Sequence, residues 1–423
     1  MQTAHKQVDG RMLLTIQLDS TDYLRSFLNG VKTYAQQVNA KGFREGSQGH
    51  LALVTKRYGE VILTDIVSNK IKEAVDNFLT KEKLLLVGNY ALKEEFRHIN
   101  IAQSSVYTFE VEFIAVPDFE LPSFKEIEVK YYEITSATAE DIDDYIKMVQ
   151  ILYSEETFQK PTVSIYDHVT GYFTEEKSTP FTFFVNKGIE QHTAIVGKEK
   201  GNIVNFSKEA REMLPLDIIH QVYKSYDVLT KDEDHHFVIT DIVAKKPCAL
   251  DQAFFDKCSG TGRIKGLTSF RKMMQEKLLQ NTQRSANLLL EANIIKAYQK
   301  KLKLKIPHYT GNQALMEIKS FIIDKILKTK SFEVYPIDMV TKLMELSTLA
   351  HVNPVLPCNN KETQKVIIDD VEASLSRPES ESYKQAYAAV LMDKSMAFIK
   401  ANITLNEEKI SVKSFRNVLY YKP

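Results

Sequence analysis

A loop bounded by two glycines constrains the fold of the N-terminal part of this chain more than any other feature. The loop reads Gly42, Phe43, Arg44, Glu45 and Gly46. It separates an amphipathic segment that ends near Asn39 from another that starts near Leu51. Glycine adopts the positive φ of a tight reversal at little cost. The pattern therefore predicts two helices joined by a short loop that carries one aromatic ring and one guanidinium group.

The aromatic ring in this loop has two interpretations, and the sequence leaves both open. A phenylalanine that faces solvent is unfavourable unless a partner covers it, so Phe43 and Arg44 together indicate a docking site. Alternatively, Phe43 packs back onto its own two helices and stabilises them.

Alternating strands are predicted on both sides of this helical pair. Leu14, Ile16 and Leu18 alternate with polar residues, and residues 107–113 show the same period of two. Leu84–Val87 reads as a further strand. Between them we expect a helix that starts after Asp19, a short helix that ends at Tyr58-Gly59 and a longer helix. Residues 12–116 are thus predicted to form a β-α-α-β-β unit.

This unit resembles the ribosome-binding domain of bacterial trigger factor, the ribosome-associated chaperone. The resemblance lies in the element order, the Gly-Phe-Arg-x-Gly loop, the run Lys56-Arg57-Tyr58-Gly59 and the strand 109–113 that leads to Pro117. The residues that the resemblance implies for ribosome binding are Gly42, Phe43, Arg44, Glu45, Gly46, Lys56 and Arg57.

The loop departs from the family pattern in its charge. Ser47 stands where lysine or arginine is usual, Glu45 stands where a neutral or basic residue is usual, and Gly49 replaces a proline. Lys41, Arg44, Lys56 and Arg57 against Glu45 leave a net charge of +3 over residues 41–57. That charge suits a local contact with an anionic surface, although it is lower than the family's usual value.

The whole chain is expected to be an α+β protein of several domains, because 423 residues exceed a single compact core. Residues 1–116 form the α/β ribosome-binding-type domain, and residues 117–154 form an extended linker over 117–135 and the first helix of the C-terminal body. The resemblance implies an FKBP-like, β-rich domain at 155–247. Residues 248–423 are expected to form an all-α chaperone body with arms.

The predicted middle domain has the strands of an FKBP-like fold without a recognisable isomerase turn. Strand candidates are 163–166, 169–173, 181–185, 202–206 and 236–243, with helices at 208–214 and 216–225. Family members carry an Ile-Pro-Gly-type turn, but Asn186–His192 contains no proline. A proline pocket needs aromatic walls, for which the candidates are Tyr166, Tyr172, Phe173, Phe183 and Phe184. These residues are more typical of strand core, so the sequence favours little isomerase activity.

The C-terminal region is predicted to be a series of helices. The helices are expected at 312–329, 336–349, 361–375 and 379–402, after a long helical segment that starts near Gly266. Pro307 and Pro336 lie in similar contexts, and either one could correspond to the family's helix boundary. Methionines are candidates for contacts with varied clients, and we expect at least half of these to be buried: Met273, Met274, Met316, Met339, Met344, Met392 and Met396.

Composition excludes several other function classes. Lys plus Arg and Asp plus Glu are 55 each, so no overall charge favours sequence-specific nucleic-acid binding. No apolar run suits a signal peptide or a membrane span, and we expect a cytoplasmic protein. The widely spaced Cys248, Cys258 and Cys358 are typical of reduced thiols. No catalytic triad or cofactor site is expected. No metal site is expected either, since Asp232–His236 reads as a solvated turn.

The favoured function is therefore an ATP-independent chaperone of trigger-factor type. The partners implied by the resemblance are the ribosomal large subunit at the tunnel exit, nascent or unfolded polypeptides and, in a dimer, a second copy of the chain. Two alternatives stay open: a peptidyl-prolyl isomerase, and a holdase that acts without the ribosome.

Overall fold

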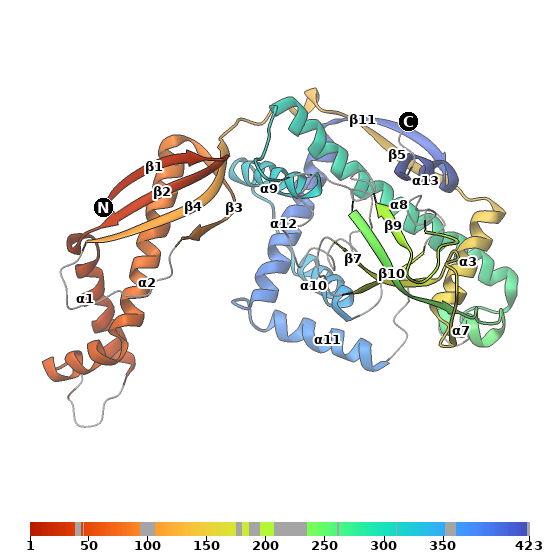
Figure 1. The fold of residues 1–423 in the computed structure, drawn as a ribbon, viewed down its shortest axis with the longest axis horizontal. Coiled ribbons are helices and arrows are strands. Elements are labelled where there is room, and N and C mark those ends of the chain that lie inside the picture. Colours follow the sequence, from red (N-terminus) through yellow and green to blue (C-terminus); the bar gives the residue numbers. More distant parts are fainter. Residues whose placement is uncertain are drawn as a thin grey trace. The chain divides into compact units, whose positions relative to one another are not determined.

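The computed structural model contains both helices and strands in more than one unit, as predicted (Figure 1). It describes residues 1–38, 44, 46–93, 106–174, 180–185, 195–206, 235–259, 262–309, 311–351 and 361–420. One unit comprises Met1–Glu120 with Leu302–Glu317, and the other comprises Leu121–Lys301 with Ile318–Pro423.

The first unit has a four-stranded antiparallel sheet covered on one face by two helices. The strand order is β1-β2-β4-β3, with β1 at Gln2–Val8, β2 at Arg11–Leu18, β3 at Leu84–Leu92 and β4 at Tyr107–Pro117. The alternation places Leu14 opposite Val111, and both are fully buried. Helix α1 (Ser20–Gln37) starts at a capping box of Asp19 and Asp22.

The second helix of this unit differs from the prediction. Helix α2 is one continuous element of 35 residues, Gln48–Glu82, so the expected break at Tyr58-Gly59 is wrong. Gly59 is buried inside the helix. A single glycine costs a helix about 1 kcal/mol, which the burial of Leu63, Val67 and Val75 on the same helix outweighs. Strand β1 was also not predicted, because all seven of its residues are exposed and lack an alternating pattern.

A segment that is distant in sequence completes the first unit. Leu304 and Ile306 are buried, and a Cβ placed on Gly10 would lie 3.1 Å from the Cβ of Pro307. The backbone N–H of Gly88 donates to the carboxylate of Glu317 at 3.3 Å. We call residues 302–317 the strap. Pro307 lies in the strap, whereas Pro336 is the first residue of helix α10 (Pro336–His351), where a proline suits the helix start.

The body of the second unit joins segments from three parts of the chain. Helices α3 (Ala139–Leu152), α7 (Gln252–Ser259), α8 (Gly266–Leu302) and α13 (Val412–Tyr420) accompany the parallel strands β5 (Glu128–Ser136) and β11 (Thr404–Ser411). The rings of Phe255 and Phe270 stack at 4.5 Å in the core. Cys258, in the same core, and Cys248 are free thiols.

Two predictions for this body are wrong. Residues 117–135 are not an extended linker throughout, because β5 occupies Glu128–Ser136, and the C-terminal region is not all-α, because it contains β11. Each strand depends on the other, more than 270 positions away, for its backbone hydrogen bonds. A polar strand such as β11 carries little local signal of that pairing.

A five-stranded sheet forms the middle part of the second unit. Its order is β6-β10-β7-β8, and β9 also pairs with β10. The bounds are β6 at Thr157–Gln159, β7 at His168–Phe173, β8 at Phe181–Phe184, β9 at Ile203–Phe206 and β10 at His235–Lys245. Four predicted strands are thus confirmed, but 163–166 is not a strand. The helices predicted at 208–214 and 216–225 lie outside the described residues.

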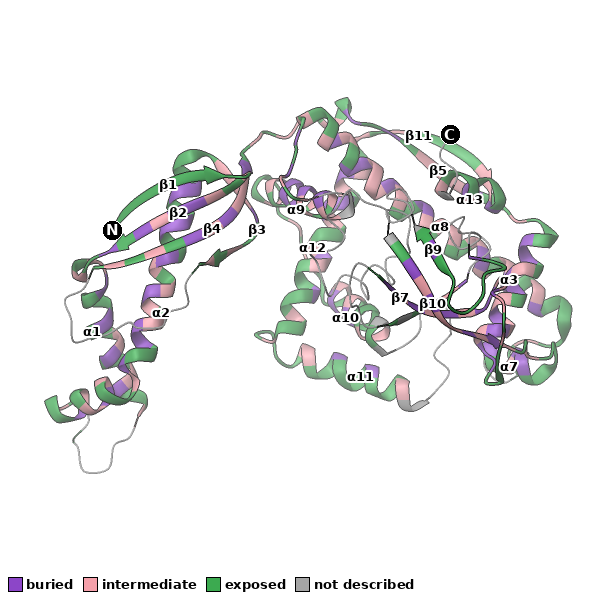
Figure 2. Cartoon of the chain, viewed as in Figure 1, coloured by how far each residue is buried: buried purple, intermediate pink, exposed green. Residues whose placement is uncertain are grey.

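A group of helices forms the rest of the second unit. Helix α9 spans Gly311–Thr329, α11 spans Lys361–Leu375 and α12 spans Glu381–Asn402, which confirms the predicted helices together with α10. Helices α10, α11 and α12 share a small core of Met339, Leu343, Val371, Ala386 and Val390. Figure 2 shows exposed residues alternating with buried ones along α11 and α12.

Candidate functional site

The predicted docking loop lies at one end of a closely packed helical pair. A Cβ placed on Gly30 of α1 would lie 2.8 Å from Cγ2 of Ile62 on α2, so the two helices approach closely there. Nearer the loop, the rings of Tyr34 and Tyr58 pack with their centroids 5.1 Å apart. Aromatic pairs at such distances stabilise a contact beyond their buried area. The sequence between the helices is therefore presented on a firmly packed support.

A buried histidine joins the two described ends of this loop. The side chain of Ser47 caps α2 by accepting the backbone N–H of His50 at 3.3 Å. The N–H of Gly46 donates to Nδ1 of His50 at 3.2 Å, and Nε2 lies 3.0 Å from the carbonyl oxygen of Val38. Since Nδ1 accepts, Nε2 carries the proton and donates to Val38. His50 is 1% exposed, and the sequence did not single it out because a lone histidine has many roles.

The structure describes four of the seven residues predicted for ribosome binding. Arg44, Lys56 and Arg57 are exposed, and Gly46 has the positive φ of 71° that the loop prediction required. Gly42, Phe43 and Glu45 lie outside the described residues, so both interpretations of Phe43 remain open. The cap at Ser47 gives a physical reason for serine at a position where the family usually has a basic residue.

The aromatic residues predicted to line a proline pocket are divided between two faces of the middle sheet. Phe173 and Phe183 belong to its buried core. Their ring centroids lie 5.5 Å and 5.6 Å, respectively, from that of Phe237. Neighbouring residues of a strand point to opposite faces of the sheet. Tyr172 therefore faces away from Phe173, and Phe184 faces away from Phe183. The five candidates therefore do not share one face.

The opposite face carries a separate aromatic group. Tyr166 stacks on Phe184 at 5.8 Å, and the ring of His168 lies 5.2 Å from the same phenylalanine. Tyr166 has a φ of 74°, which is unusual for a bulky residue, and Lys147 places its ammonium group 6.0 Å from the tyrosine ring. Burial lowers the pKa of His168. A histidine that stays neutral among aromatic rings fits a packing role.

Eight exposed apolar side chains lie on helices α10, α11 and α12 and the turn before α10. We call this set the apolar helix surface: Tyr335, Ile337, Met344, Leu346, Val366, Ile368, Tyr387 and Met392. Their exposed fractions run from 37% to 68%. Exposed apolar residues also occur elsewhere, such as Leu288 and Met316, and these eight are the ones on the helices that share one small core.

The methionines predicted to serve clients divide into two classes. Met274, Met339 and Met396 are buried, whereas Met316, Met344 and Met392 are exposed and Met273 is intermediate. The expectation that at least half would be buried is therefore wrong by a narrow margin. Helical spacing alone did not separate these classes, since the core of the α10–α12 group needs only one face of each helix.

Two further features bear on the possible chemistry. Among the residues that the structure describes, no three histidine, cysteine, aspartate or glutamate side chains gather as metal ligands would. Within the same ranges, no helix has the length and apolar composition needed to cross a bilayer. Residues 232–234 of the acidic turn lie outside the described residues.

The family model and the relatives that the chain matches all belong to one family. Residues 1–149 match the family model of the bacterial trigger factor protein. The chain is 26% identical over 216 residues to the trigger factor of Actinobacillus pleuropneumoniae serotype 3 (strain JL03), which covers 49% of this chain and 47% of that protein. It is 21% identical over 292 residues to the trigger factor of Rickettsia massiliae (strain Mtu5), which covers 67% and 63%.

These matches have a limited extent. The first of them spans about half the length of the curated relative. Among solved structures, the chain is similar to a trigger factor chaperone at 12% identity, with 94% of this chain and 99% of that chain covered and a TM-score of 0.24. So low a score supports no conclusion about the fold.

Proposed function

Because this chain is a divergent member of the trigger factor family, we propose that it is an ATP-independent chaperone. In this proposal it binds nascent or unfolded polypeptides in the cytoplasm and docks at the tunnel exit of the ribosomal large subunit. Binding without a nucleotide requires many weak contacts that release as a client folds.

The observation that carries the proposal is the apolar helix surface. Unfolded chains expose apolar side chains that must be covered, and the eight residues of this surface remain exposed although their helices already share a core. Met344 and Met392 add flexible, polarisable side chains that adapt to different client shapes. The surface therefore suits many sequences rather than one.

Docking at the ribosome is proposed for the tip of the helical pair. Arg44, Lys56 and Arg57 are exposed there. Phosphate groups of ribosomal RNA are the anionic groups that such side chains would contact. The packing of α1 on α2 and the hydrogen bonds of His50 support the loop without using these cations. The charges are thus available to a partner.

Efficient prolyl isomerisation is not part of the proposal. A preformed cup must enclose a proline side chain to lower a barrier of roughly 18–20 kcal/mol. Phe183 and Phe184 direct their rings to opposite faces of the sheet, which does not favour one cup built from the predicted residues. An isomerisation assay with a short Xaa-Pro peptide and the full chain distinguishes this account from the enzyme alternative.

The experiment that tests the proposal is suppression of client aggregation in the absence of any nucleotide. A chemically unfolded client is diluted into buffer with or without the full chain, and light scattering is followed. We expect scattering to fall as chaperone is added, with no further effect of ATP. Unchanged scattering at a molar excess would contradict the proposal. Co-sedimentation with ribosomes then separates docking from a ribosome-independent holdase.

A further inference from the structure

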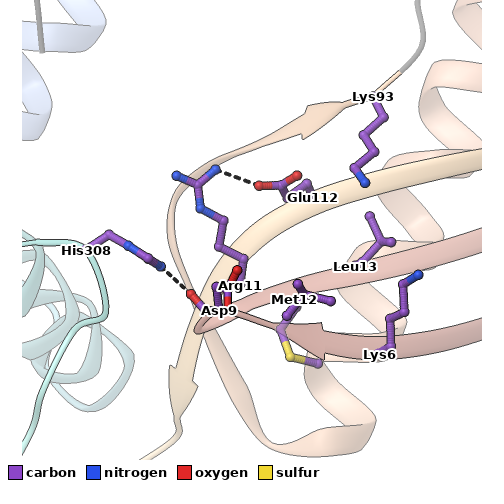
Figure 3. Close-up of a pocket in the computed structure, with 9 residues that line it drawn as sticks. Lys6, Asp9, Arg11, Met12, Leu13, Lys93, Glu112 and His308 are labelled. Carbon is purple, nitrogen blue, oxygen red and sulfur yellow. Dashed lines mark hydrogen bonds and ion pairs between the residues drawn. The ribbon is translucent and has the colours of Figure 1, made fainter. Parts of the chain in front are cut away.

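A cavity of about 470 Å³ lies in the first unit, beside the turn that joins β1 to β2 (Figure 3). It is lined by Lys6, Val8, Asp9, Arg11, Met12, Leu13, Lys93, Glu112 and His308. A volume of this size accommodates a small molecule or one to two residues of a peptide. None of its residues belongs to the docking loop or to the apolar helix surface.

The strap forms one wall of this cavity. Nε2 of His308 lies 2.5 Å from the carbonyl oxygen of Asp9 and donates to it, which fixes the histidine against the turn. The Cβ of Pro307 lies close beside Gly10 at the same turn, where φ is 77°. Because it contacts backbone groups of the turn, this wall of the cavity has a fixed position.

The cavity has an apolar floor with cations at its rim. Leu13 is only 5% exposed although it faces away from the main core, and the exposed Val8 extends the apolar area on the same face of the sheet, whereas Met12 packs against the main core. Lys6 lies opposite Leu13 on the neighbouring strand, and Glu112 lies opposite Leu13 on the other side. Figure 3 shows the side chains of Lys6 and Lys93 on either side of Leu13.

The cations of the rim differ in whether they already have a partner. Arg11 donates to Glu112 at 2.6 Å, and this hydrogen bond lowers the pKa of Glu112. Lys93 forms a long ion pair with Glu110, in which the nitrogen and the carboxylate oxygen are 3.9 Å apart. Lys6 makes no ion pair with any residue that the structure describes. Lys6 is thus available for an anion, and Lys93 is held only by a long contact to Glu110.

We propose that this cavity binds a carboxylate carried by an acidic, partly apolar peptide. The carboxylate accepts charge-assisted hydrogen bonds from Lys6 and Lys93, and an adjacent aliphatic side chain covers Val8 and the small exposed part of Leu13. Asp9 and Glu112 disfavour ligands with dense negative charge, such as nucleic acid or a phosphate group. A single carboxylate next to an apolar group fits this balance.

The proposed occupant is a segment of a client polypeptide, so this inference rests on the proposed chaperone function. Binding of a short peptide is nevertheless measured without any folding client. If the peptide binds here while aggregation is not suppressed, only the proposed function fails. If aggregation is suppressed but the chain binds acidic and neutral peptides equally well, only the cavity proposal fails.

The test uses the full chain and two fluorescein-labelled peptides that alternate leucine with either glutamate or glutamine. Fluorescence anisotropy gives their dissociation constants at low salt. We expect the glutamate peptide to bind about tenfold more tightly than the glutamine peptide, as two partly exposed charge pairs would produce. Sodium acetate at millimolar concentration should not displace the peptide, since it lacks the apolar part; displacement by acetate would favour a site for free carboxylates and contradict the peptide proposal.

Two variants locate the effect. Lys6→Gln/Lys93→Gln should remove the preference for glutamate, whereas Lys72→Gln/Lys81→Gln, which changes two exposed lysines of α2, should retain it. Both variants have the same change in net charge, so a general electrostatic effect cannot distinguish them. Equal affinities for the two peptides in the unmodified protein, or equal losses in both variants, would overturn the proposal.

Discussion

The imidazole of His50 on α2 lies with its Nε2 3.0 Å from the carbonyl oxygen of Val38, just beyond the end of α1. The same ring accepts the backbone N–H of Gly46 through Nδ1 at 3.2 Å. One buried side chain therefore connects both described ends of the loop between the helices. This arrangement leaves the exposed cations of the tip free of a structural task.

The first prediction concerns this histidine. His50→Leu keeps an apolar body but removes both partly buried hydrogen bonds, so the carbonyl of Val38 and the N–H of Gly46 lose their partner. We expect the free energy of unfolding of the first unit to fall by about 1–3 kcal/mol. Urea denaturation followed by circular dichroism measures this loss. A variant as stable as the unmodified protein would show that the two hydrogen bonds contribute nothing.

The second prediction concerns the charge of the tip. Arg44→Ala/Lys56→Ala/Arg57→Ala removes three exposed cations and should leave the thermal midpoint nearly unchanged. If these cations contact ribosomal phosphates, affinity in co-sedimentation should fall and the slope of log K against log salt should decrease by about 2 to 3.

The control for the tip is a triple variant of exposed lysines elsewhere on the two helices, Lys32→Ala/Lys72→Ala/Lys81→Ala. It should retain the salt slope of the unmodified protein. An equal loss in both variants would mean that the tip has no special role. A substitution of Ser47 by lysine is a poor test of added charge, since it removes the cap of α2.

The third prediction concerns the middle sheet. A Cβ placed on Gly171 would lie 2.2 Å from the carbonyl oxygen of Val238 and 2.3 Å from Cζ of Phe237. Gly171→Ala should therefore destabilise this sheet by ~3 kcal/mol, because backbone of β10 must move. Thr174→Ala, at an exposed position just after the same strand, should have little effect. Limited proteolysis of the middle sheet compares the two, and equal resistance would contradict the prediction.

The fourth prediction concerns pH. Burial alone would raise the pKa of Glu291, but hydrogen bonds and charge from Lys400 and Lys319 outweigh it and keep that pKa below its ordinary value. The two lysine nitrogens lie 2.9 and 3.1 Å from the carboxylate, which links α8 to α12 and α9. The folded state thus binds a proton less readily than the unfolded state.

The contribution of Glu291 to stability is therefore complete above its ordinary pKa and is lost as the pH falls through the folded value. Glu291→Gln should lose stability at pH 7 and show a smaller difference from the unmodified protein at pH 3. Denaturation at the two pH values measures this. A difference that is the same at both would contradict the ion-pair account.

Much of the first unit could be predicted from sequence because its signals are local. The alternation of Leu14, Ile16 and Leu18 follows from a sheet with one buried face, and Gly46 adopts the positive φ that its position in a reversal indicated. The helices of the C-terminal region were predicted for the same reason, since their apolar residues recur at helical spacing and prolines mark their limits.

The remaining features depend on contacts that no local pattern encodes. The parallel pairing of β11 with β5, the strap on the first sheet and the ring of His50 between Gly46 and Val38 all join distant or non-periodic positions. The aromatic residues of the middle sheet were identifiable as strand residues. Their division between two faces became clear only from the register of β7 with β8 and β10.

The central claim is that the apolar helix surface binds unfolded clients, and one pair of variants tests it most directly. One variant replaces an exposed apolar residue on each of three helices: Met344→Ser, Ile368→Ser and Met392→Ser. Its control replaces exposed polar residues on the same helices without a change in net charge: Thr341→Ala, Asp369→Ser and Lys384→Ser. Aggregation of a diluted, unfolded client is followed by light scattering. The account predicts that the first variant loses most of the suppression while the control retains it, with equal thermal midpoints. Equal suppression by both variants would contradict it.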